Sequence, residues 1–63
     1  MALLQTLKDS NFRIIGYIYD EGDYLVLKDD YFRIKGYYYK NDNVTKDDYF
    51  RIVGYGNILT TLL

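Results

Sequence analysis

The sequence predicts an all-β protein, an antiparallel meander of about six short strands built from three tandem β-hairpin units. One ten-residue pattern occurs three times, and each copy contains an aspartate where a tight turn is expected. Aromatic residues make up 19% of the chain, as nine Tyr and three Phe, and both residue types favour strands. We expect the sheet to be strongly curved or closing, with a short helical turn at its C-terminal end.

The repeat defines the organisation of the chain. Its pattern is Lys-Asp-x-x-Phe-Arg-Ile-x-Gly-Tyr, found at 8–17, 28–37 and 46–55. We expect one domain, 1–63, with units at about 4–19, 24–39 and 43–56 and a tail at 57–63. Copies start 20 (28 − 8) and 18 (46 − 28) residues apart, and a parallel β-solenoid with one coil per copy is the alternative architecture.

Each unit is predicted to be a strand, a tight turn and a second strand. The turns begin at Asp9, Asp29 and Asp47, because an aspartate carboxylate can accept a hydrogen bond from the backbone two residues later. Polar segments at 20–23 and 40–43 supply the turns between units. The acidic pairs are therefore interpreted as turn residues, and their pattern does not match a calcium-binding loop.

Period-2 alternation divides each second strand into two faces. The face that carries Phe, Ile and Gly keeps the same residues in every copy, so we expect it to form the core. A glycine repeated within a strand indicates a bend or the close approach of another segment. The predicted core residues are Phe12, Phe32, Phe50, Ile14, Ile34 and Ile52.

The tail has a different pattern. Asn57 is a suitable N-cap, and the apolar residues that follow it are spaced as on one side of a helix. So short a helix is not stable alone, and it has to pack against the sheet or a neighbouring subunit. A final edge strand is the competing interpretation.

The composition excludes several classes of function. The chain contains no cysteine and no histidine, so it has no disulfide and cannot use Ser–His or Cys–His catalysis. We predict no enzymatic activity, no cofactor and no metal site. A net charge of −1 argues against non-specific nucleic-acid binding. No apolar run approaches the roughly 20 residues that span a bilayer, and the N-terminus lacks signal-peptide features, so we expect a cytoplasmic protein.

Small size predicts self-association. A chain of 63 residues buries little apolar surface, and without disulfides or metals a partner subunit is the remaining source of stability. We expect a homo-oligomer, most simply a dimer, held by tyrosines of the second unit and by the tail. The candidate interface residues are Tyr38, Tyr39, Ile58, Leu59, Leu62 and Leu63.

A second candidate surface consists of one Arg and one Tyr from each copy. Strand alternation places the two residues on the same face, where guanidinium groups and rings could hold a partner or an anion. In the simpler interpretation, each Arg pairs with a turn aspartate and covers a tyrosine ring. The candidate binding residues are Arg13, Arg33, Arg51, Tyr17, Tyr37 and Tyr55.

These D-x-x-x-R-I-x-G-Y units, with the closing G-N-x-L-x-x-L-L at 56–63, resemble small uncharacterised bacterial and phage β-repeat proteins. They are more loosely similar to β-flower and WG- or YD-type repeats. The resemblance extends from Leu7 to Leu63. Members often carry glycine where this chain has Phe12, Phe32 and Phe50, so their turn geometry need not apply here. The resemblance implies a fold and no activity.

Three functions remain open. The first is a non-enzymatic binding protein that acts as a small homo-oligomer and occludes a surface of a partner protein, such as a host protein targeted by a phage-encoded inhibitor of host defence. The second is a sponge that encloses a nucleotide or another anion between Arg–Tyr rows. The third is a purely structural assembly module.

Overall fold

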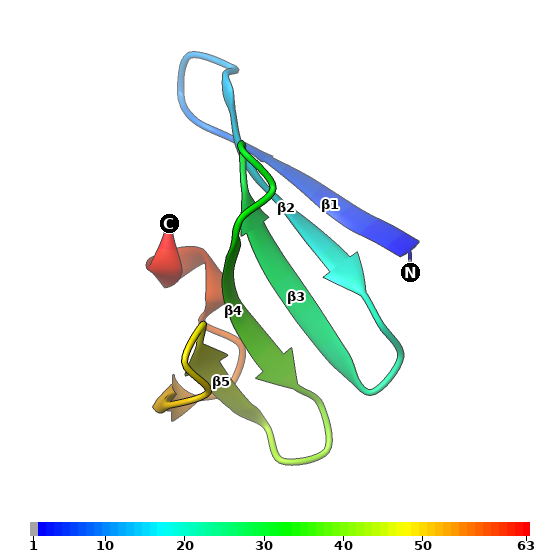
Figure 1. Ribbon diagram of the computed structural model, residues 1–63. Coiled ribbons are helices and arrows are strands. Elements are labelled where there is room, and N and C mark those ends of the chain that lie inside the picture. Colours follow the sequence, from blue (N-terminus) through cyan, green and yellow to red (C-terminus); the bar gives the residue numbers. More distant parts are fainter. Residues whose placement is uncertain (1) are drawn as a thin grey trace.

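The computed structural model describes residues 2–63 as a single antiparallel sheet of six strands in the order of the chain, followed by one 3-10 turn (Figure 1). Each strand pairs with the next, so the meander is confirmed and the parallel solenoid is excluded. The first and last strands are both edges, and the sheet does not close. The elements are β1 (Ala2–Lys8), β2 (Ile14–Asp20), β3 (Tyr24–Asp29), β4 (Ile34–Tyr39), β5 (Val44–Asp47), β6 (Ile52–Tyr55) and η1 (Leu59–Leu62).

The three turns within the units share one geometry. The carboxylate of Asp9 accepts a hydrogen bond from the Asn11 backbone N–H at 2.8 Å, and the corresponding bonds in the other two turns measure 2.9 Å. The backbone N–H of each repeat Phe donates to the Asp carbonyl three residues earlier at 3.0 Å. The predicted aspartate turns are confirmed. Each turn also holds its Phe in the left-handed region, with φ between 62° and 64°, where glycine is the usual residue.

A β-bulge follows each turn and changes which side chains face the core. Leu7 lies across from Gly16, but the next pair along is Lys8 with Ile14, so Ile15 is an extra residue. The same shift occurs after Leu27 and after Thr45. Because strict alternation is broken between the Ile and the Gly, the two residues lie on opposite faces.

The predicted core is therefore wrong in its Phe and Ile residues. The three Phe side chains are 57–82% exposed, and the three Ile side chains are 40–55% exposed. The glycines and Ile18, on the far side of the bulge, do lie on the core side. The buried cluster is formed by Leu7, Ile18, Leu25, Leu27 and Leu59, with Tyr38 and Leu62 packed against it.

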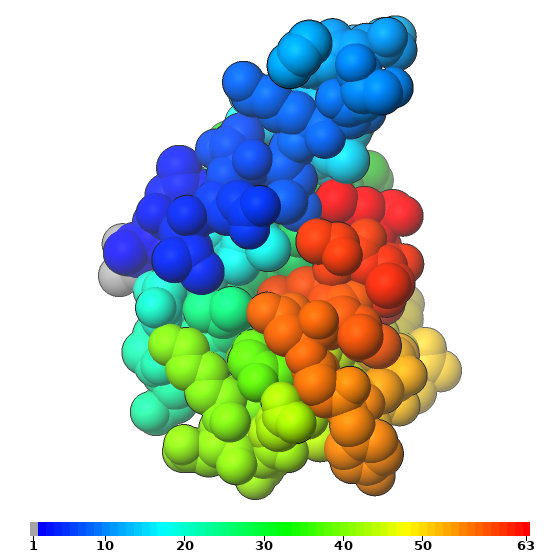
Figure 2. Space-filling view, turned by 180° about the vertical axis from the view of Figure 1, so that it is seen from behind, coloured from blue at the N-terminus to red at the C-terminus, as the bar shows by residue number. Residues whose placement is uncertain are grey.

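The tail covers this side of the sheet, which we call the covered face; the tail crosses it in orange and red in Figure 2. A Cβ atom added to Gly54 would lie 2.5 Å from Ile58 Cδ1, and one added to Gly16 would lie 3.1 Å from Leu63 Cδ2. Gly36 meets Leu62 in the same way. The repeated glycines thus provide the space in which the tail packs, as the close-approach interpretation predicted. The predicted helical turn is confirmed, and Asn57 Oδ1 accepts a hydrogen bond from the Leu59 N–H at 3.2 Å.

Candidate binding surface

The opposite side of the sheet, which we call the aromatic face, gathers most of the tyrosines. Tyr17 and Tyr19 on β2 and Tyr37 and Tyr39 on β4 are two residues apart, so each pair projects to one side. The strand register shows that the two pairs lie on the same side of the sheet. Tyr19 lies across from Val26 on β3, and Val26 lies across from Tyr37. The aromatic face comprises Tyr17, Tyr19, Tyr24, Tyr37, Tyr39, Tyr55, Phe32 and Phe50.

Its rings touch one another. Tyr24 lies 5.4 Å from Tyr39 and 5.9 Å from Tyr37, measured between ring centroids, and Tyr37 lies 6.2 Å from Tyr39. Phe50 stacks on Tyr37 at 4.9 Å with an interplanar angle of 11°. Aromatic pairs at these separations contribute beyond the area they bury, so these contacts stabilise the arrangement of the rings.

The aromatic face is not purely apolar, because two lysine ammonium groups lie over its rings. The Lys28 ammonium lies 5.0 Å from the ring centre of Tyr19, and the Lys46 ammonium lies 4.9 Å from that of Tyr39. Burial, with smaller contributions from Tyr37 and Tyr24, raises the pKa of the Tyr39 hydroxyl. The phenol therefore stays protonated at neutral pH and can both donate and accept hydrogen bonds.

A shallow hollow of about 220 Å³ opens on the aromatic face. Apolar atoms of Val26 and Ile34 and the rings of Tyr24 and Tyr37 line it, while Glu21 and Lys28 add one charge of each sign. This volume is smaller than that of most small-molecule sites, which occupy about 300–1,000 Å³. The hollow is large enough for one side chain of a partner.

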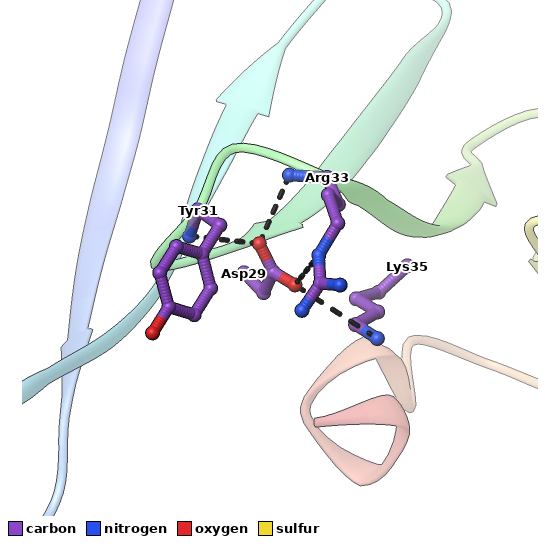
Figure 3. A network of polar contacts seen from close by, with 4 residues as sticks. All are labelled: Asp29, Tyr31, Arg33 and Lys35. Carbon is purple, nitrogen blue, oxygen red and sulfur yellow. Dashed lines mark hydrogen bonds and ion pairs between the residues drawn. The ribbon is translucent and has the colours of Figure 1, made fainter.

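Two of the candidate arginines are held by the turns. Arg33 Nε donates to Asp29 Oδ2 at 2.8 Å, and its guanidinium lies 5.3 Å from the ring centre of Tyr31 (Figure 3). Arg51 repeats both contacts with Asp47 and Tyr49 at the same distances. The simpler interpretation thus describes these two residues, although the ring that each covers belongs to the turn and not to the strand.

These contacts also affect the carboxylates. Burial acts to raise the pKa of Asp29, but hydrogen bonds from Arg33 and from the Tyr31 N–H outweigh it, and the pKa lies below its ordinary value of 3.8. The hydrogen bond from the Arg51 N–H is the main cause of the lowered pKa of Asp47. Both carboxylates are ionised at neutral pH and hold their arginines in place.

The first unit differs. It has Ser10 and Asn11 where the other units have Asp and Tyr, so no turn tyrosine is present for Arg13 to cover. Asp9 accepts a bond from the backbone N–H of Arg13 at 3.0 Å. The three arginines consequently do not form a uniform row.

The candidate interface residues divide between the two faces. Tyr39 lies on the aromatic face, whereas Tyr38 packs against the core and donates its hydroxyl proton to Asn43 Oδ1 at 2.8 Å. Leu59 is 1% exposed and Leu62 packs against the same core cluster, so much of the apolar surface of the tail is buried within the chain. Leu63 remains 43% exposed.

Sequence reasoning missed Tyr24, the two lysines and the stacked Phe residues as parts of the aromatic face. The signal was present: Lys28 and Lys46 occupy the same position of the repeat, and antiparallel pairing of adjacent units places each beside a tyrosine pair. The bulge, which moves the Phe to this side, has no comparable signature in the sequence.

Among residues 2–63 no group of three or more acidic residues lies close enough to hold a metal ion. The described chain also has no helix long and apolar enough to cross a membrane. No family model, curated protein or solved structure matches the sequence or the fold. The aromatic face is thus the feature of the chain from which a function can be argued.

Proposed function

We propose that this chain is a non-enzymatic binding protein that acts as a small homo-oligomer and covers a surface of a partner protein with its aromatic face. One observation carries the proposal: two groups of contacting aromatic rings, around Tyr17 and around Tyr37, lie on a side of the sheet that no other segment of the described chain covers. Tyrosine combines an apolar ring with a polar hydroxyl, and it is enriched at protein interfaces for that reason.

The shape of the surface favours a protein over a small ligand. The 220 Å³ hollow is shallow, and rings and apolar side chains line it together with two charged residues, Glu21 and Lys28. A partner side chain that entered it would meet the rings of Tyr24 and Tyr37 together with the charges of Glu21 and Lys28. Buried anchors of this kind provide most of the binding energy in protein interfaces.

The setting of this activity is also a proposal. Absence of cysteine fits a reducing compartment, so we propose a cytoplasmic location. A short, aromatic-rich chain suits a phage-encoded inhibitor that blocks a host defence protein.

The anion-binding alternative has less support. It needs free guanidinium groups, but Arg33 and Arg51 are each bound to an aspartate at 2.8 Å and lie over a turn tyrosine. The purely structural module leaves the mostly half-buried tyrosines of the aromatic face without a role.

Affinity capture with matched baits tests the proposal. The wild-type chain and two variants, Tyr24→Lys and Tyr31→Ala, are immobilised and exposed to bacterial extract, and the retained proteins are quantified. Tyr24→Lys places a charge in the hollow, whereas Tyr31 lies on a turn, is 74% exposed and serves as the control. We expect one partner whose affinity falls about thirtyfold with Tyr24→Lys, the effect of losing an interface anchor.

Retention of the same proteins by all three baits, or of none by the wild type, would contradict the proposal. Nucleotide released from the purified protein by heat denaturation, in a constant ratio to chain, would favour the anion sponge instead. Circular dichroism of each bait establishes that the variants are folded.

A further inference from the structure

The units of the chain are joined by one repeated aromatic contact. Phe32, in the turn of the second unit, stacks on Tyr17 of the first unit at 5.0 Å and 6°. Phe50, in the turn of the third unit, stacks on Tyr37 of the second at 4.9 Å and 11°. In the second and third units, the turn Phe thus stacks on the tyrosine of the Gly-Tyr dipeptide in the unit before it.

At two of the three turns, this contact offsets part of the cost of an unfavourable backbone. A Phe in the left-handed region is rare, and strain of this kind persists where the surrounding structure compensates it. For Phe32 and Phe50 the stacking supplies the compensation. Phe12 has the same conformation, with φ of 62°, but among residues 2–63 it has no aromatic partner and is 82% exposed.

The opposite end of the chain lacks the other half of the contact. Tyr55 occupies the position of Tyr17 and Tyr37 in the third unit, and within residues 2–63 no further unit supplies a Phe to cover it. Its side chain is 79% exposed. The chain therefore presents an unpaired turn Phe at one edge of the sheet and an unpaired receiving Tyr at the other.

The strand edges repeat the same complementarity. Where units meet inside the chain, Tyr17 lies across from Lys28 and Gly16 from Asp29, and the second junction pairs Tyr37 with Lys46 and Gly36 with Asp47. At the free edges, β6 ends in Gly54-Tyr55 and β1 ends at Lys8, followed by Asp9. Both halves of the junction are therefore present in one chain, at its two ends.

Apart from a bulge at Leu4, edge β1 lacks the usual protection against pairing. It is seven residues long, carries no charge before Lys8, and exposes 54% of Leu3 and 57% of Leu4. Edges with these properties pair with other strands unless a charge, a proline or a covering segment prevents it.

We propose that copies of this chain associate head to tail, with β1 of one copy beside β6 of the next and Phe12 stacked on Tyr55. This inference rests on the self-association in the proposed function and identifies its surface: the contact that joins the units within the chain also joins the chains. The contact is heterologous, because it joins two different surfaces. It produces a ring if the rotation between successive copies brings the last copy back to the first, and a filament if it does not. Backbone pairing in it is short, because the chain leaves the sheet after Tyr55 at Gly56, whose φ is 80°.

Two variants each remove one half of the contact. Phe12→Gly removes the ring and relieves the backbone, and Tyr55→Ala removes the receiving ring; both positions are exposed, so the fold is preserved. Light scattering at equal concentrations should show the wild type above the single-chain mass of 7.5 kDa and each variant at that mass. Tyr49→Ala, 73% exposed on a turn, is the control and should behave as the wild type.

Mixing the two variants is the decisive step. The Tyr55→Ala chain retains Phe12 and the Phe12→Gly chain retains Tyr55, so an equal mixture has one intact contact and should give a species of two chains that cannot grow. A symmetric contact between two β1 edges predicts instead that Tyr55→Ala still associates alone, which would overturn the proposal.

The remaining outcomes separate this inference from the proposed function. An associated wild type whose mass neither variant changes would refute the head-to-tail contact and leave self-association standing. A monomeric wild type would refute both. Capture of a partner protein by the aromatic face is measured separately, through Tyr24→Lys, and its failure does not affect the mixing result.

Discussion

The two faces of the sheet are made by the same strands but are completed in different ways. The covered face carries small side chains at Gly16, Gly36 and Gly54, and the tail lies over them so that Leu59 is 1% exposed. The aromatic face carries large rings that lean on one another and have no covering segment in the described chain. One face is completed within the molecule, and the other is available for contact.

A single dipeptide produces this difference. Each unit has Gly-Tyr at the same place, and alternation along the strand sends the missing side chain to one face and the ring to the other. Repetition aligns three glycines under the tail and three tyrosines on the aromatic face. The repeat thus encodes the shape of both faces at once.

The largest expected effect tests the covered face. Leu59→Ala removes the tail side chain that is most deeply buried in the core cluster, and truncations of this kind cost about 2–5 kcal/mol of unfolding free energy. Urea unfolding followed by circular dichroism measures the change. Leu63→Ala, at a position 43% exposed, is the control and should cost clearly less. Equal losses would mean that the tail does not complete the core.

A smaller effect tests the glycine positions. A Cβ added to Gly36 would lie 2.6 Å from the backbone carbonyl oxygen of Lys46, which cannot move without disturbing the sheet. We expect Gly36→Ala to cost about 1–3 kcal/mol, as overpacking usually does. At Gly54 the nearest neighbour is the mobile end of Ile58, 2.5 Å away, so Gly54→Ala should cost less.

A double variant sharpens this result. Ile58→Ala should remove most of the penalty of Gly54→Ala, because the only atoms within 4 Å of the added Cβ belong to Ile58. The coupling between the two substitutions, from a double-mutant cycle of unfolding free energies, measures that contact. Simple additivity would show that the tail does not approach Gly54.

Substitution of two turn Phe residues by glycine should change the stability of the chain by different amounts. Phe12→Gly relieves a left-handed backbone that costs about 1–2 kcal/mol and removes no intramolecular stack, so the isolated chain should become more stable by up to that amount. Phe32→Gly relieves the same backbone but loses the stack on Tyr17, which is worth about 0.5–1.5 kcal/mol, and the changes nearly cancel. Thermal unfolding at low protein concentration compares them. A loss of stability with Phe12→Gly would contradict the strain argument.

The fold was predicted correctly from the sequence, whereas the aromatic face was predicted only in part. The repeat and its aspartates determine six strands, and the glycines correctly indicate a segment that packs closely. Alternation places Tyr17 and Tyr37 away from the core, as observed. It fails for Phe12, Phe32 and Phe50, because a bulge after each turn reverses the phase and a left-handed Phe has no sequence rule that predicts it. The contacts of the tail with particular glycines depend on tertiary packing, which local patterns do not contain.

The smallest expected effect concerns acid stability, and it probes the one acidic side chain buried on the covered face. Asp29 is 5% exposed, and its pKa in the folded chain lies below 3.8 because hydrogen bonds from Arg33 and Tyr31 outweigh the effect of burial. A carboxylate whose pKa is lowered by folding stabilises the folded chain at pH values above its unfolded pKa. This contribution is lost as the pH falls through 3.8 towards the pKa of the folded chain. The wild type should therefore lose stability over this interval.

Asp29→Asn should make that decline shallower, because the amide cannot take up the proton that the unfolded carboxylate binds. At neutral pH the variant should be slightly less stable, since Arg33 loses its charged partner while its own side chain is 69% exposed and well solvated. Urea midpoints measured from pH 7 to pH 2 follow both effects. The comparison variant, Asp42→Asn, alters an exposed loop carboxylate and should retain the slope of the wild type. If the two variants showed the same slope, Asp29 would not be the group that links the covered face to pH, and the lowered pKa values of Asp20 and Asp47 would account for the acid sensitivity instead.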